Sequence, residues 1–277
     1  MNNTKKIVSV QDISCFGQCS LTVALPVLSA YGIETAILPS AILSTHTGGF
    51  KNYTVLDLTD EMPKIVRHWH EENIKFDAIY TGYIGDTRQF SLIKDMRSLL
   101  NPGGLLLVDP AMADFGKLYS ALDNSIVDGM KSLICEADVI CPNITEAAFL
   151  LGKEYCENPS AEQVKSMLRD LCSMGPKISI MTGVSPEDGK IGAMAYDAAD
   201  DKFTEFYSER VPHTFHGTGD VFASVLFANI INGKPLSEAL EDACEFVVKA
   251  INETVDDPSH GYGVRFEQVI NSWCKNK

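Results

Sequence analysis

The feature of this 277-residue chain that most constrains its fold is a regular alternation of short apolar runs with longer segments of helical period. A short apolar run bounded by turn residues predicts a buried strand, and alternating strands and helices predict βα units around a mainly parallel sheet. The sequence therefore predicts an α/β fold, a doubly wound three-layer α/β/α arrangement. The expected strands lie at residues 6–10, 35–43, 78–81, 105–108, 139–141 and 178–181.

The remaining segments complete the expected architecture. Residues 191–196 and 203–209 flank a polar stretch and predict a small antiparallel β-hairpin. No repeat, low-complexity tract or linker rich in Pro, Gly or Ser divides the chain, so we expect one domain, residues 1–277. Helices are expected at 21–31, 60–72, 88–100, 120–136, 161–174, 221–231, 236–254 and 266–274.

The charge balance of the chain disfavours polyanionic partners. Asp and Glu number 37 against 23 Lys and Arg, and the net charge of -14 repels nucleic acid and anionic membrane surfaces. The first apolar run is too short for a secretory signal, and no run reaches the ~18 apolar residues of a membrane span. The eight Cys residues lack zinc-site spacing, so we expect reduced thiols, mostly in the core, and a cytoplasmic protein.

Polar or glycine-containing segments follow almost every expected strand. In doubly wound sheets ligands bind beyond the carboxyl ends of the strands, so these segments would share one edge of the sheet. Each segment alone is weak evidence, because loops are polar in general. Their common location is the stronger signal. The segments are Gln11-Asp12, 44–49, 82–85, Asp109-Pro110, Pro142-Asn143 and Thr182-Gly183.

The stretch HGTGD directly precedes a long apolar helical run. Its plain interpretation is a glycine turn followed by an acid that helps to start a helix. Its functional interpretation is an anion pocket in which Gly217, Thr218 and Gly219 offer backbone N–H groups to a transferred phosphoryl group. Asp220 would then accept a proton from the attacking hydroxyl.

Two common nucleotide motifs are absent from the sequence. There is no GxxxxGK[ST] P-loop and no GxGxxG after the first strand, which argues against a Walker-type NTPase and an NAD-dependent dehydrogenase. His216 is expected to be a hydrogen-bonded neighbour of the glycines, because a catalytic His needs a positioned partner.

Acidic and amide side chains at the same edge suit a magnesium ion. Asp109 directly follows an apolar run, and Asp114 follows five residues later; carboxylates beside a phosphate pocket are ligands that Mg²⁺ prefers. Asp114 is equally well explained as a solvated turn residue. Asn143 and Glu146 fit a helix N-cap with a capping Glu, and the same pair can organise magnesium through water, so the two interpretations are compatible.

Taken together, these motifs resemble the ribokinase-like superfamily, which includes the PfkB-type carbohydrate kinases. GTGD and NxxE mark the superfamily, whereas HTG, TGYIG and DPxMxDxGKLY point to its pyridoxal/pyridoxamine kinase branch. The matched segments are SVQD at 9–12, STHTGG at 44–49, TGYIGD at 81–86, VDPAMADFGKLY at 108–119, CPNITEAAFLLG at 141–152 and HGTGDVFAS at 216–224.

The resemblance implies an enzyme that transfers the ATP γ-phosphate to the 5′-hydroxymethyl group of pyridoxal, pyridoxamine or pyridoxine. It implies Mg²⁺ with ATP, leaves room for a monovalent cation, and implies a homodimer. By matching position, Asp220 is the base, Gly217 to Gly219 form the anion hole, and the remaining roles fall into three groups. These are magnesium at Asp109 and Glu146, nucleotide at Asn143, Glu146, Thr182, Asp114 and Tyr119, and the pyridine ring at Asp12, Thr47 and Tyr83.

Three alternatives to these assignments stay open. Tyr83 is as well explained by packing under a loop. Hydroxymethylpyrimidine kinases of the superfamily often carry an acid in their first loop, as Asp12 is here, although their phosphate motif commonly reads GTGC where this chain has Asp220. A non-catalytic regulatory protein that binds nucleotide or vitamin B6 needs the phosphate cradle but no base.

Asp12 stands where pyridoxal kinases usually have Ser. A buried acid near an organic ligand is costly unless a cation or donor pairs with it, so Asp12 predicts a preference for pyridoxamine, whose aminomethyl group is protonated. The alternative is that Asp12 turns away to cap the helix near Leu21 or to meet solvent.

Overall fold

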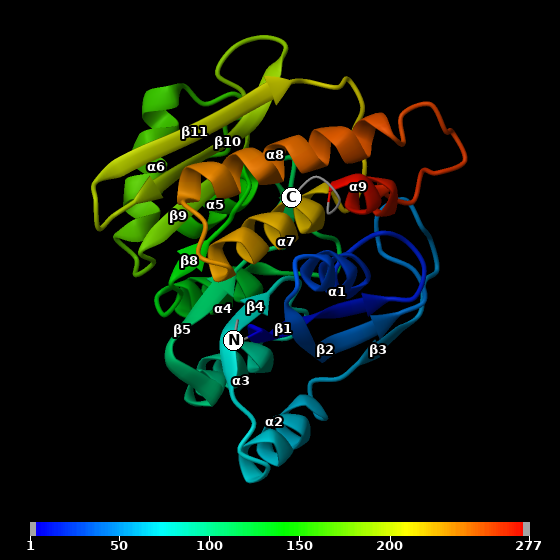
Figure 1. Ribbon diagram of the computed structural model, residues 1–277, viewed down its shortest axis with the longest axis vertical. Helices are drawn as coiled ribbons and strands as arrows, with labels where there is room; N and C mark the ends of the chain where they lie inside the picture. The colour runs from blue at the N-terminus through cyan, green and yellow to red at the C-terminus, as the bar shows by residue number, and fades with distance from the viewer. Residues whose placement is uncertain (1–3, 274–277) are drawn as a thin grey trace.

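A nine-stranded sheet forms the centre of the computed structural model, which describes residues 4–273 (Figure 1). Its strands are β1 (Lys6–Ser14), β2 (Glu34–Leu43), β3 (Val55–Asp57), β4 (Phe76–Thr81), β5 (Leu100–Val108), β8 (Val139–Ile140), β9 (Ile178–Val184), β10 (Lys190–Asp197) and β11 (Lys202–Glu209). Their order is β11-β10-β9-β8-β5-β4-β1-β2-β3. The strands from β9 to β2 run parallel, and antiparallel strands stand at both edges.

Helices cover both faces of this sheet. They are α1 (Leu21–Ala30), α2 (Met62–Glu71), α3 (Thr87–Asp95), α4 (Asn124–Ile134), α5 (Ile144–Leu151), α6 (Ala161–Cys172), α7 (Thr218–Ile231), α8 (Leu236–Asn252) and α9 (Phe266–Trp273), with a 3₁₀ turn at Met96–Leu99. Side chains of α2 to α6 share one hydrophobic cluster, and those of α1, α7, α8 and α9 share the other. The layers alternate along each strand: Ile7 belongs to the second cluster and its neighbour Val8 to the first.

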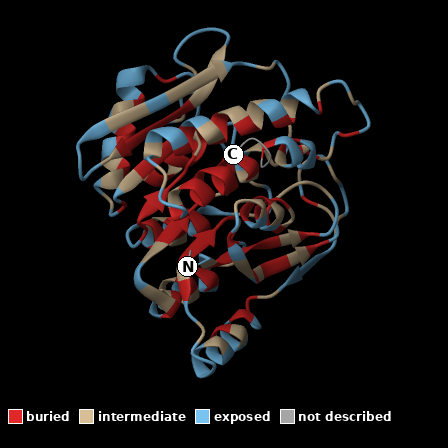
Figure 2. Cartoon of the chain, viewed as in Figure 1, coloured by how far each residue is buried: buried red, intermediate tan, exposed pale blue. Residues whose placement is uncertain are grey.

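The apolar run that follows GTGD becomes a largely enclosed helix. In α7 residues 221–229 and Ile231 are all buried, because the helix packs against α8, α1 and β4 (Figures 1 and 2). A helix that is apolar on all sides is stable only when neighbours enclose it. This enclosure fixes the N-terminus of α7, where Asp220 lies.

The predicted fold class is confirmed, and the predicted hairpin is β10 and β11. The expected helix at 120–136 begins later, at Asn124, because Asp123 caps it by accepting a hydrogen bond from the backbone N–H of Ser125. The helix expected at 266–274 is described from Phe266 as far as Trp273, and Cys274 lies outside the described residues. The short strand β3 and the ribbon of β6 (Ala113–Asp114) and β7 (Lys117–Leu118) were not predicted.

Several strands are longer than the sequence pattern indicated: β4 and β5 begin earlier, at Phe76 and Leu100, and β1 and β9 end later. β1 continues through Gln11 and Asp12 to Ser14, so these polar residues lie inside a strand and not in a loop after it. Their side chains are buried with hydrogen-bond partners, Gln11 Nε2 donating to Ser9 Oγ at 3.1 Å. In the same way β9 includes Thr182 and the glycine that follows it.

The expectation that the Cys residues lie mostly in the core is wrong for the part of the chain that the structure describes. Only two of the described thiols are buried, and the described thiols are all free. The buried ones are Cys141 and Cys244, whereas Cys19 and Cys172 are partly buried and Cys15, Cys135 and Cys156 are exposed.

Among the described residues no helix combines the length and the apolar character needed to span a bilayer. That residues 1–277 form one domain, and that the protein is cytoplasmic, stay predictions.

Candidate active site

The predicted site residues lie around the carboxyl ends of the parallel strands and the start of α7. Asp109 directly follows β5, Asn143 follows β8, and Thr182 forms a backbone bridge with Asn143. Gly217 caps α7 in the left-handed region, with φ 80°. The first N–H groups of a helix have no intrahelical acceptor, and that those of the GTG segment donate to an anion stays a prediction.

Asp220 is the third residue of α7. Its carboxyl accepts a backbone hydrogen bond from Ser20, yet burial raises its pKa to about 7, with the charges of Asp12 and Asp114 adding to the effect. A base whose pKa lies near the working pH is well matched to taking a proton from an alcohol. The electrostatics of Asp220 therefore suit the predicted role.

His216 packs against the loop of residues 44–49. The His216 ring lies so close to Gly48 that a Cβ there would stand 2.4 Å from it. The centroids of the His216 and His46 rings are 5.3 Å apart. His46 is itself buried, with Nδ1 accepting from the Gly48 N–H at 3.1 Å and Nε2 3.1 Å from the carbonyl of Tyr262. Burial lowers the pKa of His46. His216 is exposed and packs beside His46, and its expected role as a neighbour of the glycines and not a base stays a prediction.

Asp114 is exposed, and two hydrogen bonds hold its carboxylate. Each oxygen of its carboxylate accepts one hydrogen bond, from Tyr119 Oη at 3.0 Å and from Asn143 Nδ2 at 3.0 Å. Although the residue is exposed by solvent accessibility, desolvation by the surrounding atoms raises the pKa of Asp114. Asp109 is more deeply buried, and burial, followed by the charges of Glu146 and Asp220, raises its pKa well above the usual range. The structure thus brings Asp109, Asp114, Tyr119 and Asn143 together.

The predicted capping box at α5 is present. Asn143 Oδ1 accepts from the Glu146 N–H, and Glu146 Oε2 accepts from the Asn143 N–H, both at 2.9 Å. Glu146 Oε1 also accepts from the Met112 N–H at 2.9 Å, so one carboxylate ties α5 to the loop that carries Asp114. Burial raises the pKa of Glu146 to about 8.

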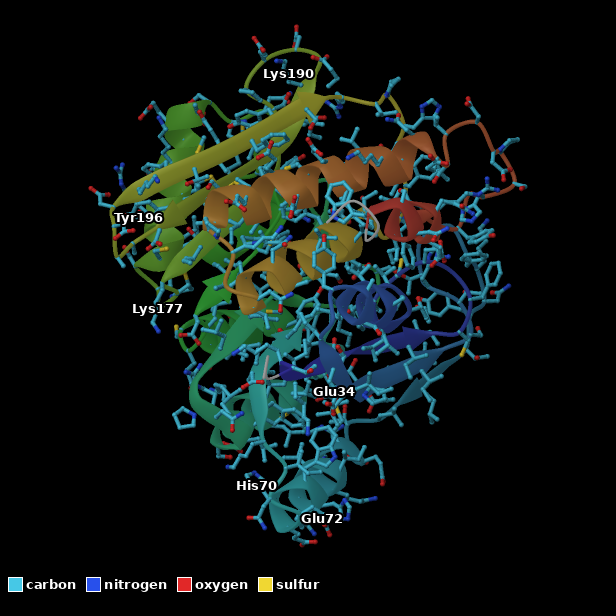
Figure 3. All side chains as sticks on the ribbon, in the orientation of Figure 1. Glu34, His70, Glu72, Lys177, Lys190 and Tyr196 are labelled. Carbon is cyan, nitrogen blue, oxygen red and sulfur yellow. The ribbon has the colours of Figure 1, made fainter. Side chains whose placement is uncertain are left out.

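The acids of the site have no basic partner. Within residues 4–273 no Lys or Arg forms an ion pair with Asp12, Asp109, Asp114, Glu146 or Asp220. Paired lysines lie at the periphery, where Lys177 bonds Asp138 at 2.8 Å and Lys190 lies 3.6 Å from Glu187 (Figure 3). Asp12, Asp109 and Glu146 of this set are buried, and a buried carboxylate without a basic partner favours a bound cation.

Mg²⁺ fits this donor set, because it prefers carboxylate oxygens and keeps several waters. No three His, Cys, Asp or Glu side chains in the described part of the chain converge closely enough to enclose a metal ion. An ion near Asp109 and Glu146 would therefore take its other ligands from water and substrate phosphates.

Glu146→Gln is expected to raise the Mg²⁺ concentration for half-maximal activity by about tenfold, in the range typical of residues that orient a metal site. The melting temperature should also fall, because one amide oxygen cannot serve both the Met112 and the Asn143 N–H groups. A magnesium titration of initial rate and a thermal melt check both effects. Asp123→Asn, which neutralises the capping acid of α4, is the control with unchanged magnesium dependence. Equal magnesium curves for Glu146→Gln and wild type would leave Glu146 with the capping role alone.

The predicted ring-pocket residues are placed unevenly. Asp12 is 4% exposed and accepts hydrogen bonds from Ser14 Oγ at 3.0 Å and Ser20 Oγ at 2.5 Å. Its charge raises the pKa of both Asp220 and Tyr83, although burial is the larger cause for each, so these three groups are electrostatically coupled. Tyr83 is partly buried, and its ring packs on Gly85. Thr47 is exposed beside His46, with no described contact to Asp12.

The two glycines of GTG make different structural demands. A Cβ on Gly217 would stand 1.7 Å from the carbonyl oxygen of Gln18, whereas a Cβ on Gly219 would meet no atom within 4 Å. Gly217→Ala should therefore melt well below wild type, since positive φ alone costs an L-residue ~1–2 kcal/mol.

Gly219→Ala should melt at or above wild type, because Ala favours helix by ~1 kcal/mol over Gly. Its kcat/KM for ATP should fall at least about tenfold, because the methyl group stands where a phosphoryl oxygen would approach the bare backbone. Thermal melts and initial rates at varied ATP check the pair. Full activity of Gly219→Ala would contradict the phosphate-cradle assignment.

One residue at the site escaped the sequence reasoning. Ser20 directly precedes an apolar helical segment, and that pattern indicates only an N-cap. Asp12 lies 8 residues from Ser20 and Asp220 lies 200 residues from it, so no local pattern predicts that Ser20 is close to both acids.

Comparison with known proteins gives this site a family. A model of the phosphomethylpyrimidine kinase family matches residues 25–264. A phosphomethylpyrimidine kinase candidate from Bacteroides thetaiotaomicron, crystallised with pyridoxal, has a TM-score of 0.93 and 37% identity, covering 98% of this chain and 96% of its own. The pyridoxal kinase of Lactobacillus plantarum has a TM-score of 0.90 and 32% identity, covering 98% of this chain and 96% of its own. The hydroxymethylpyrimidine/phosphomethylpyrimidine kinase of Bacillus subtilis is 28% identical over 253 residues, 88% of each chain.

Proposed function

This chain belongs to the phosphomethylpyrimidine kinase family, and from that membership we propose that it transfers the γ-phosphate of ATP to the 5′-hydroxymethyl group of a vitamin B6 vitamer. The resemblance drawn from the motifs is thereby confirmed. The observation that carries the choice of substrate is the pyridoxal present in the Bacteroides relative, which matches almost the whole of this chain.

The residues divide the reaction between them as follows. Asp220 takes the proton of the substrate hydroxyl, whose oxygen then forms a bond to the γ-phosphorus while the bond to the bridging oxygen breaks and ADP leaves. The N–H groups of Gly217, Thr218 and Gly219 stabilise the charge on the transferring group. Mg²⁺ near Asp109 and Glu146 would neutralise the phosphates.

The nucleotide and ring contacts are part of the same proposal. Asn143 and Tyr119 hold Asp114 by hydrogen bonds, which supports a shared role of these three residues beside the phosphates. Thr182 is proposed to contact nucleotide, and Asp12, Thr47 and Tyr83 to surround the pyridine ring. A monovalent cation and a homodimer stay expectations of the family resemblance.

A second candidate is hydroxymethylpyrimidine phosphorylation, which the family description and the Bacillus relative favour. Both substrates carry a hydroxymethyl group on a nitrogen heterocycle, so the same base and the same backbone N–H groups of the GTG segment can act on either. The acid at Asp220, where such enzymes commonly have Cys, supports the vitamin B6 assignment.

Steady-state ADP release with and without pyridoxal tests whether the chain is a kinase. The proposal expects release that depends on pyridoxal and Mg²⁺. A regulatory protein would bind nucleotide or vitamin B6 and show no pyridoxal-dependent ADP, and that result would overturn the proposal.

A further inference from the structure

Ser20, the residue before α1, has a backbone conformation that is unfavourable for serine. Its φ is 53° and its ψ is −131°, in a region that glycine adopts readily and residues with a Cβ rarely do. The residue is 7% exposed, so its surroundings hold it in this conformation. Strain of this kind persists only where the surrounding structure imposes it, and it is often found at functional sites.

The hydroxyl of Ser20 does not cap the helix that it precedes. An N-cap serine ordinarily accepts a hydrogen bond from a backbone N–H of the first turn, but α1 has no side-chain cap. Ser20 Oγ instead donates to Asp12 Oδ1 at 2.5 Å, inside the sheet edge. The Ser20 side chain is therefore a hydrogen-bond donor to Asp12 in β1 and not the N-cap of α1.

The backbone of Ser20 serves the other acid. Its N–H lies close enough to Asp220 to act against the effect of burial on the pKa of that carboxyl, and the neighbouring Gln18 carbonyl packs so closely against Gly217 that a Cβ there would stand 1.7 Å from the oxygen. Residues 18–20 therefore form the surface on which the N-terminus of α7 rests. Ser20 links one carboxyl through its hydroxyl and the other through its N–H.

We propose that Ser20 is a positioning residue for Asp220, because its hydroxyl bond to Asp12 fixes the strained conformation in which its N–H meets the Asp220 carboxyl. The inference rests on the proposed role of Asp220 as the base. With one carboxylate oxygen held by this N–H, the other is directed to the substrate hydroxyl, and small losses of such alignment slow a reaction markedly.

Two substitutions separate the hydroxyl from the backbone strain. Ser20→Ala and Ser20→Gly both remove the bond to Asp12, but only Gly relieves the positive φ. We expect kcat with MgATP and pyridoxal to fall about tenfold in both variants, the value of one ordinary hydrogen bond, with KM for MgATP unchanged. Ser20→Gly should melt at a higher temperature than Ser20→Ala.

Ser14→Ala is the matched control. Ser14 is 1% exposed and its Oγ also donates to Asp12, at 3.0 Å, but it is not among the groups that donate to Asp220. This variant should lose less than about threefold in kcat, since Asp12 loses a donor while the Ser20 link stays. An equal loss in Ser14→Ala and Ser20→Ala would place the effect on the Asp12 charge and overturn the inference.

The remaining outcomes also decide the matter. If Ser20→Gly has wild-type kcat and melts above Ser20→Ala, then the loss in Ser20→Ala comes from backbone strain alone, and the positioning role is overturned. Asp220→Asn, measured in parallel, separates the two proposals. A slow Asp220→Asn with normal Ser20 variants defeats the Ser20 inference alone, whereas a normal Asp220→Asn defeats the base assignment and, with it, the positioning role.

Discussion

Asp220→Asn is expected to phosphorylate pyridoxal roughly 10²–10⁴ times more slowly than wild type, the usual contribution of a positioned base. The amide cannot take the proton of the hydroxymethyl group, whereas the GTG backbone that holds the phosphates is unchanged. The loss should therefore appear in kcat, with KM for ATP nearly constant. Initial rates at saturating MgATP measure it.

The pH dependence of the same reaction follows from the pKa of Asp220, which burial raises to about 7. The base is active when ionised, so wild-type kcat/KM should rise with pH and level off above pH 7. Folding stability changes with pH in the opposite direction, because this carboxyl ionises less readily in the folded state than in the unfolded chain. Folding stability is therefore lost as pH rises from about 4 to about 7. Asp220→Asn removes that penalty, so it should melt above wild type at pH 8.

Glu238→Gln provides the control for Asp220→Asn. Glu238 is likewise an acid in the first turn of a helix, α8, but it is exposed. Its neutralisation should leave kcat and the pH profile unchanged. Near-normal turnover in folded Asp220→Asn would remove Asp220 from the catalytic role.

Asp12→Ser is expected to reduce the preference for pyridoxamine over pyridoxal by about ten- to 150-fold, the value of a charge-assisted hydrogen bond of ~1.5–3 kcal/mol. The Asp12 carboxylate accepts from Ser14, from Ser20 and from its own N–H. A carboxylate has about four acceptor positions, so one is left for the protonated aminomethyl group of pyridoxamine.

The ratio of the two kcat/KM values is the appropriate measure for Asp12→Ser. Loss of the Asp12–Ser20 bond slows both substrates alike, and this common effect cancels in the ratio. Ser14→Ala, which keeps the charge of Asp12, should leave the ratio near that of wild type. An unchanged ratio in Asp12→Ser would leave Asp12 as the partner of Ser14 and Ser20 without a recognition role.

The layered fold could be predicted because hydrophobic periodicity records burial directly. Strand ends were harder to predict, because a polar residue normally marks the end of a buried strand. Gln11, Asp12 and Thr182 break that rule. Asp12 accepts from Ser14 and Ser20, Gln11 donates to Ser9 on its own strand, and Thr182 forms a backbone bridge with Asn143. β3 lies at the edge with all three residues exposed, so it carries no burial signal at all.

In the candidate site, too, local contacts could be predicted from the sequence and contacts between distant segments could not. The capping box of Asn143 and Glu146 is local, and the spacing of the two residues predicts it fully. The second function of Glu146, holding the Met112 N–H, joins segments 34 residues apart and has no sequence signature. Ser20 is the hardest case to predict, because its N-cap pattern gives no sign of the positive φ, the bond to Asp12 or the proximity to Asp220.

Mass spectrometry of the wild-type protein incubated with MgATP and, separately, pyridoxal, pyridoxamine, pyridoxine and hydroxymethylpyrimidine tests the central claim most directly. The account predicts an added phosphate on the vitamin B6 vitamers, with pyridoxamine preferred. Phosphate on hydroxymethylpyrimidine alone, or on none of the four compounds, would contradict it.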